Sequence, residues 1–178
     1  MVKILKIVLL VVVVLVVAVL AYAATRPGSL HVQRSASINA SPDKIFPLIN
    51  DFHSWSAWSP YEKIDPAMKR SYSGSPKGNA AVYEWEGNSN VGQGRMEITD
   101  AAPPSKVTIK LDFVKPLEGH DIAQFTLEPQ GSATTVTWSM DGPTPYIGKV
   151  IGIFLNMDRM IGGDFETGLG NLKTIAEK

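Results

Sequence analysis

The segment from residue 68 to residue 140 constrains the fold most, because apolar and polar residues alternate along it in several short runs. Such alternation is typical of strands in a sheet that buries one face and exposes the other. Turn-forming sequences separate the runs, for example at residues 74–76, 102–104 and 130–131. The segment therefore predicts five or six antiparallel strands.

The alternation also predicts which side chains share a face of the sheet. Glu84 and Glu86 alternate with Tyr83 and Trp85, so we expect the two carboxylates to face solvent. The apolar face is expected to carry Tyr83, Trp85, Met96, Ile98, Val107, Ile109, Leu111, Phe113, Ala123, Phe125, Leu127, Val136, Trp138 and Met140. An apolar sheet face needs another element packed against it.

Beyond residues 141–143 the apolar residues follow helical spacing, from Ile147 to Ile175. A long C-terminal helix is therefore predicted, and it is the natural partner for the apolar sheet face. Six glycines interrupt the pattern, and each weakens a helix interior by roughly 0.5 to 1 kcal/mol relative to alanine. We expect a break in this helix near residues 157–163.

Residues 31–38 also alternate and predict a first strand. Ser41 and Pro42 then suit the start of a helix, since serine can cap a helix and proline fits its first turn. This helix is expected to reach about Asn50, and Pro47 should kink or shorten it because proline removes a backbone donor.

The N-terminal residues 7–24 carry no charge and are almost entirely aliphatic. At roughly 1.5 Å per helical residue, the run covers nearly all of a ~30 Å hydrocarbon core. We therefore predict a transmembrane helix, with membrane contact through residues 4–24. A signal peptide is the alternative, because the run has a basic start and residues 21–23 resemble a cleavage site.

The chain thus divides into an anchor or signal segment, residues 1–25, and a domain of residues 26–178. Lys3, Lys6 and the amino terminus outweigh the single Arg26 that follows the apolar run. By the positive-inside rule, the N-terminus is expected in the cytoplasm. The domain of this single-pass protein is then expected on the extracytoplasmic, periplasmic side.

Charge and composition narrow the possible partners. Beyond residue 25 the chain holds 15 basic and 17 acidic residues, a net charge of −2. So small an imbalance argues against a nucleic-acid partner. The chain has no cysteine, which excludes disulfides, thiolate nucleophiles and thiolate metal ligands.

The order of the elements carries a family resemblance. A strand is followed by a helix that begins at Ser41-Pro42, a corner with the sequence Asp51-Phe52-x-x-Trp55-x-x-Trp58-Ser59-Pro60, a meander of strands and a long helix. This order resembles the SRPBCC superfamily, also called START-like, which includes polyketide cyclases and the birch-pollen allergen type. The resemblance covers about residues 30–178.

This resemblance implies an α+β helix-grip fold. A curved seven-stranded antiparallel sheet would wrap around the long C-terminal helix, with two short helices after the first strand and an apolar cavity between sheet and helix. The family has no universal catalytic residue, so the resemblance assigns no catalytic role to any residue of this chain.

Aromatic and methionine side chains suit the lining of an adaptable apolar pocket. The predicted lining of the cavity is Trp55, Trp58, Tyr83, Trp85, Met96, Phe113, Phe125, Trp138, Phe154 and Met157, with Met160 in the same set. The same side chains could equally fill a solid core, and the sequence leaves both possibilities open.

No catalytic motif stands out in the sequence. The three histidines lie on unrelated segments without metal-binding spacing, so no metal site and no cofactor are predicted. Asp51, His53 and Glu62, near the tryptophan corner, are the candidates for acid–base chemistry at a cavity mouth.

The sequence therefore predicts a membrane-anchored protein that binds a hydrophobic small molecule or lipid. The alternative is an enzyme of the polyketide cyclase or hydrolase kind that acts on an aromatic or polyketide-type substrate. A third possibility is an envelope protein whose domain contacts a partner. The lack of a catalytic motif favours binding over catalysis.

Overall fold

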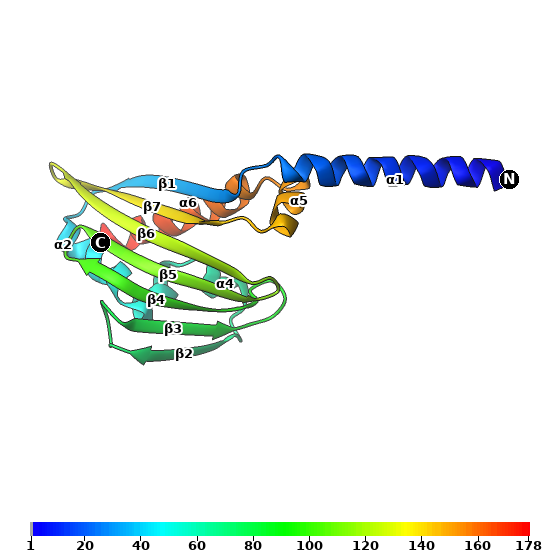
Figure 1. Cartoon of the computed structure of the whole chain (residues 1–178). Helices are drawn as coiled ribbons and strands as arrows, with labels where there is room; N and C mark the ends of the chain where they lie inside the picture. Colours follow the sequence, from blue (N-terminus) through cyan, green and yellow to red (C-terminus); the bar gives the residue numbers. More distant parts are fainter. Residues whose placement is uncertain (1) are drawn as a thin grey trace.

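The computed structural model describes residues 2–178, and its seven strands form one antiparallel sheet. The strands are β1 (Ser29–Ile38), β2 (Lys69–Gly74), β3 (Ala81–Glu86), β4 (Gln93–Ala102), β5 (Lys106–Lys115), β6 (Gly119–Gln130) and β7 (Ala133–Pro143). Their order across the sheet is β1-β7-β6-β5-β4-β3-β2, so the last six form an uninterrupted meander (Figure 1). This confirms the predicted sheet.

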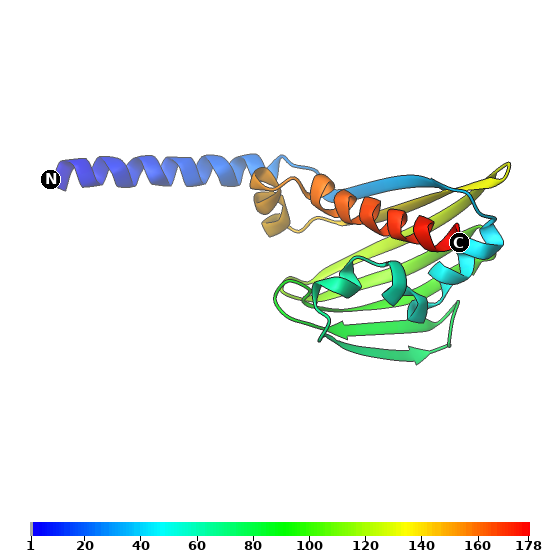
Figure 2. The same ribbon diagram turned by 180° about the vertical axis from the view of Figure 1, so that it is seen from behind.

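The helices follow the predicted order as well. They are α1 (Val2–Ala24), α2 (Pro42–Asn50), the 3₁₀ turn η1 (Phe52–Ser54), α3 (Trp55–Trp58), α4 (Tyr61–Ile64), α5 (Tyr146–Phe154) and α6 (Met157–Ala176). Figure 2 shows α2, α4 and α6 on one face of the sheet. Since α6 packs mainly against β1 and α3, the helix-grip fold is confirmed.

The connection from β1 to β2 crosses the sheet from one edge to the other. The backbone oxygen of Ser41 accepts bonds from the amides of Lys44 and Ile45, but its side chain makes no capping hydrogen bond. Pro47 lies inside α2, which still ends at Asn50. The tryptophan corner after α2 consists of η1 and α3.

The break in the C-terminal helical region lies before the predicted one. Leu155 adopts extended backbone angles and Asn156 caps α6, with its Oδ1 2.9 Å from the amide nitrogen of Arg159. From Met157 onward α6 is continuous, so the break lies just before residues 157–163, the range near which it was predicted. Gly162 does not interrupt α6; it admits the Arg34 guanidinium, which a Cβ at this position would overlap.

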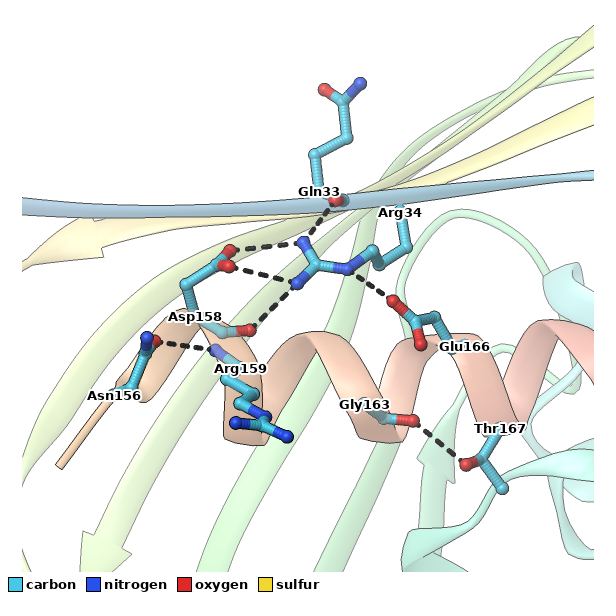
Figure 3. Close-up of polar contacts among 8 residues, drawn as sticks. All are labelled: Gln33, Arg34, Asn156, Asp158, Arg159, Gly163, Glu166 and Thr167. Carbon is cyan, nitrogen blue, oxygen red and sulfur yellow. Dashed lines mark hydrogen bonds and ion pairs between the residues drawn. The ribbon is translucent and has the colours of Figure 1, made fainter.

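Arg34 joins β1 to the first half of α6 (Figure 3). Its Nη1 and Nη2 donate to the two carboxylate oxygens of Asp158 at 3.1 and 3.0 Å, and its Nε donates to Glu166 at 2.8 Å. The guanidinium holds the pKa of the Asp158 carboxyl below its ordinary value. A bidentate contact of this kind fixes the relative orientation of its two partners as well as attracting them. It therefore sets how α6 lies on β1, the edge strand.

The N-terminal helix α1 extends away from the domain (Figure 1). Of its residues only Ala23 is buried, and the helix is long and apolar enough to cross a membrane. Near its C-terminal end α1 contacts α5, where the Tyr146 hydroxyl donates to the backbone oxygen of Leu20 at 2.7 Å. The end of the candidate span is therefore tied to the domain.

Candidate ligand-binding site

Aromatic rings fill much of the space between the sheet and α6. The ring of Trp138, in β7, stacks on Phe165 of α6 with centroids 4.1 Å apart. Trp55 and Trp58 of α3 meet Trp138 edge-on at 6.4 and 5.7 Å, and Phe125 of β6 lies 4.8 Å from it. These five rings form what we call the aromatic core, which is solid at this end of the interior.

Gly168 makes the approach of α6 to the aromatic core possible. A Cβ on this glycine would lie 2.8 Å from Cζ3 of Trp138 and 3.1 Å from Cδ of Pro60. Atoms at such distances overlap, so only glycine fits. One of the glycines that weakens α6 as an isolated helix thus allows it to pack.

Eight of the ten predicted lining residues lie in or against the hydrophobic core. Trp55, Trp58, Tyr83, Trp85, Met96, Phe125 and Trp138 are buried in it, and Phe113 packs against it half-buried. Phe154 is 70% exposed, Met157 is half-buried and Met160 is exposed. The structure does not bring these three into the interior: Phe154 ends α5, and Met157 and Met160 lie in the first turn of α6 with side chains that are not buried. Whether the eight contact a ligand stays a prediction.

The indole nitrogens of the three central tryptophans differ in their bonding. Trp55 Nε1 donates to the backbone oxygen of Ile49 at 3.0 Å, and Trp58 Nε1 donates to that of Leu48 at 2.9 Å. Both carbonyls belong to the last turn of α2, where helical carbonyls lack partners. Trp138 Nε1 is buried without a partner among residues 2–178. A buried donor of this kind is a group that a ligand or a water would satisfy.

Tyr61 lies beside Trp138, and Asp164 lies beside Tyr61. The Tyr61 ring is 6.5 Å from the Trp138 ring. Burial raises the pKa of the Tyr61 hydroxyl, and the neighbouring Asp164 carboxylate raises it further. Burial also raises the pKa of Asp164, with Tyr61 opposing the shift. We call Tyr61, Asp164 and Trp138 the inner polar group. Titratable groups with shifted pKa values inside a fold are candidates for ligand contact.

Sequence reasoning missed Tyr61 and Asp164. Asp164 could have been identified from its position in α6, three residues after Ile161 and four before Gly168. Residues at these spacings share one helix face, and both of these neighbours face the sheet side. A carboxylate within an otherwise apolar stripe predicts a buried polar contact.

Replacing Asp164 by asparagine is expected to raise the melting temperature at neutral pH. Because folding raises the pKa of Asp164, the folded protein holds this proton more tightly than the unfolded chain. Stability therefore falls as pH rises from the ordinary value of 3.8 through the raised one. The gain of the variant over wild type should shrink as pH is lowered, which thermal unfolding across pH measures.

Asp158→Asn is the matched control for this prediction. The pKa of Asp158 is lowered by Arg34, so its carboxylate stabilises the fold at neutral pH and this contribution is lost as pH falls. The control should lower the melting temperature at neutral pH, with a smaller effect in acid. A gain for Asp164→Asn that stays constant across pH would contradict the assigned burial.

The acid–base candidate Glu62 does not lie at an open cavity mouth. Its side chain is 7% exposed, and its two oxygens accept from Arg70 Nε at 2.7 Å and Tyr83 Oη at 2.5 Å. Burial, and then the Glu62 carboxylate, raise the pKa of the Tyr83 hydroxyl. The pairing of β2 with β3 brings these partners over Glu62, a long-range effect that residue spacing does not reveal.

Asp51 and His53 do lie together, at the edge of the sheet. Asp51 Oδ1 accepts from the amide of His53 at 2.9 Å and lies 2.9 Å from His53 Nδ1, and the imidazole stacks on Tyr72 at 4.1 Å. His53 borders a cleft of about 210 Å³, lined by Phe52, His53, Tyr72, Ser73, Gly74, Ser75, Pro76, Ala81 and Val82. None of the ten predicted lining residues borders this cleft.

A larger groove of about 490 Å³ lies beside α5, outside the sheet–helix interior. Its lining comes from the α1–β1 linker, the start of β1 and the region around α5. These residues are Arg26, Pro27, Ser29, Leu30, Thr144, Gly148, Lys149, Gly152, Ile153, Phe154, Leu155, Asn156, Met157 and Asp158. We call it the α5 groove, and it is where Phe154 and Met157 lie.

Within residues 2–178, no three His, Asp or Glu side chains gather as a metal ion would require. The curved sheet, the gripped helix and an apolar interior with a few polar groups define a ligand-binding helix-grip domain. A family model described as polyketide cyclase / dehydrase and lipid transport matches residues 29–177. The chain belongs to this family, as the resemblance implied. No curated protein matches the chain in sequence.

Solved structures agree on the fold. The di-domain ARO/CYC BexL from the BE-7585A biosynthetic pathway matches with a TM-score of 0.65 and 13% identity, over 89% of this chain and 53% of that one. Protein CV1439 from Chromobacterium violaceum matches with a TM-score of 0.59 and 12% identity, over 86% of this chain and 99% of that one. Aha1 from Colwellia psychrerythraea matches with a TM-score of 0.59 and 15% identity, over 83% of this chain and 96% of that one. This chain spans about half of the di-domain protein.

Proposed function

We propose that the domain binds a hydrophobic small molecule or lipid while α1 anchors the chain in a membrane as a single span. The observation that carries the proposal is α1 itself, an apolar helix of 23 residues whose most apolar stretch is not buried by the protein. Such a helix is stable in hydrocarbon and costly to expose to water. With the cytoplasmic lysines at its start, the domain would lie on the extracytoplasmic side.

The ligand is proposed to lie beside the inner polar group. The aromatic core fills the interior at β7, so the ligand is proposed to extend toward β5, where Leu111 and Phe113 are only half-buried. Trp138 Nε1 and the Tyr61 hydroxyl would orient a polar end of the ligand, and the apolar sheet face would hold the rest. A few polar groups in an apolar pocket are the usual composition of small-molecule sites.

Native mass spectrometry of the full chain, extracted from its membrane in mild detergent, tests this proposal. We expect a bound apolar molecule, and Tyr61→Phe should weaken the binding of a fluorescent lipid by about twofold to tenfold, as for the loss of one hydrogen bond. Tyr72→Phe, in the edge cleft, is the matched control and should bind normally. An empty chain that binds no fluorescent lipid would overturn the proposal.

The anchor is tested separately by alkaline extraction of membranes and by determining the N-terminal residue of the mature chain. An integral span stays with the membrane and keeps the first residues. Release from the membrane, together with a mature N-terminus near residue 24, would instead favour a signal peptide.

An enzyme of the polyketide cyclase or hydrolase kind is the second candidate function. The observation that favours it is that partial burial raises the pKa of Asp164 beside Tyr61, because a raised pKa brings a carboxyl group closer to what a general acid needs. Turnover of an aromatic or polyketide-type substrate that Asp164→Asn abolishes, and that Asp51→Asn leaves unchanged, would support catalysis. Absence of turnover in the wild-type chain leaves binding as the function.

A further inference from the structure

The helix α5 is apolar on all sides, yet the protein buries none of its residues. It carries Tyr146, Ile147, Val150, Ile151, Ile153 and Phe154, with Lys149 as its only charged residue. Tyr146 and Ile147 are each 50% exposed and Phe154 is 70% exposed. A helix that is apolar all round is normally buried in a core or in a membrane, so α5 lacks its expected surroundings.

The position of α5 indicates what those surroundings are. α5 packs beside the C-terminal end of α1, and the Tyr146 hydroxyl bonds to the backbone of Leu20. Figures 1 and 2 both show α5 at the end of the domain from which α1 departs. If α1 spans a bilayer, as proposed above, α5 lies at the level where that span leaves the hydrocarbon. This is the depth at which short amphipathic and apolar helices rest on a membrane.

The α5 groove adds unpaired positive charge at the same level. Its lining includes Arg26 and Lys149, and neither forms an ion pair with any carboxylate in residues 2–178. Asp158, the acidic residue of the lining, is already bound by Arg34 (Figure 3). The groove therefore offers two cations without an ion-pair partner among residues 2–178, beside exposed apolar side chains, and this combination matches the phosphate and acyl chains of a lipid.

Gly152 keeps part of the groove open. Gly148 and Gly152 lie one turn apart on α5 and both line the groove. A Cβ on Gly152 would meet no atom within 4 Å, so the space beside it is empty and not taken up by a neighbour. A larger side chain at this position would occupy the groove without disturbing the domain.

We propose that the α5 groove binds an anionic phospholipid of the leaflet from which α1 emerges, with Arg26 and Lys149 on its phosphate and the exposed side chains of α5 among its acyl chains. This site is separate from the interior beside the inner polar group. It rests on the proposed membrane anchoring by α1, and it would hold the α5 end of the domain against the bilayer.

The test uses the full chain in phosphatidylcholine vesicles with and without phosphatidylglycerol. Since the chain has no cysteine, Phe154→Cys carries a single nitroxide label, and Ser132→Cys at the opposite end of the domain is its control. We expect the label at position 154 to be open to oxygen and shielded from a water-soluble nickel complex. The label at position 132 should be open to the nickel complex.

Charge and groove variants test the lipid site itself. Each of Arg26→Gln and Lys149→Gln should lower the preference for phosphatidylglycerol over phosphatidylcholine by about fivefold, as for one cation near an anionic surface. Lys44→Gln and Lys77→Gln, two exposed lysines away from α5, should leave it unchanged. Gly152→Leu should reduce phospholipid retention by filling the groove.

The outcomes separate this inference from the proposed function. A chain that stays in the vesicles after alkaline extraction, but whose label at position 154 is as open to nickel as the label at 132, overturns the α5 site and leaves the anchor intact. Unchanged lipid preference in both charge variants and in Gly152→Leu overturns it as well. A chain that leaves the vesicles overturns the anchor and the site together.

Discussion

Replacing Trp58 by alanine is expected to lower the free energy of unfolding by about 3 to 5 kcal/mol, the range for removing a large aromatic side chain from a packed core. Trp58 is fully buried, and its ring lies 4.8 Å from Trp55 and 6.0 Å from Phe125. The substitution also removes the donor to the Leu48 carbonyl. Urea unfolding of the full chain in detergent, followed by circular dichroism, measures the loss.

Trp58→Phe separates packing from hydrogen bonding. Phenylalanine keeps most of the ring contacts but leaves the carbonyl of Leu48 without its donor, so we expect a smaller loss of roughly 1 to 3 kcal/mol. If alanine costs no more than phenylalanine, the aromatic core is not what holds α3 against the sheet. A ligand-filled cavity would then be the better description of this end of the interior.

The sheet and its gripped helix could be predicted because their signals are local. A period of two along residues 68–140 and a period near 3.6 beyond Ile147 follow from the backbone geometry of strands and helices. The packing of the helix against the sheet follows as well, since each has an apolar face that must be buried against another element. The predicted solvent exposure of Glu84 and Glu86 is confirmed for the same reason.

The separation of α5 from α6 could not be predicted from periodicity. Apolar residues continue at helical spacing through this region, and the break depends on the extended backbone of Leu155 and on a cap by Asn156. Glycine content pointed to a later position, but Gly162 and Gly168 fit close neighbours, not bends. Phe154 therefore lies in the groove, although its spacing matches that of the interior residues.

The polar part of the interior was also beyond sequence reasoning. The buried state of Glu62 depends on Arg70 and Tyr83, which reach it only after β2 has paired with β3. The pKa of Asp164 is raised by its burial, and Tyr61, which α4 places against α6, opposes the shift. The burial and pKa of such groups depend on contacts between elements that are distant in sequence, so composition and spacing could not identify them.

Replacing Arg70 by leucine is expected to lower the free energy of unfolding by about 2 to 4 kcal/mol. Removing one partner of a buried ion pair leaves the other charge uncompensated, at a cost of about 3 to 5 kcal/mol when both are fully buried. Here Glu62 is 7% exposed and Arg70 is 24% exposed, so solvent reduces the cost. Urea unfolding of the full chain in detergent measures it.

The double variant Glu62→Leu/Arg70→Leu tests whether the two charges interact. The single and double variants are made on a Tyr83→Phe background, so that no hydroxyl loses its acceptor. The double variant should lose less free energy of unfolding than the sum of the two single variants, by about 1 to 3 kcal/mol. Lys69→Leu is the control from the same strand: its ion pair with Glu86 spans 3.5 Å between side chains that are 82% and 57% exposed, so the cost should stay below about 1 kcal/mol. Additive losses at Glu62 and Arg70 would mean that solvent screens the pair. The position of α4 over β2 would then depend on Tyr61 and its apolar neighbours, since the ion pair would add little.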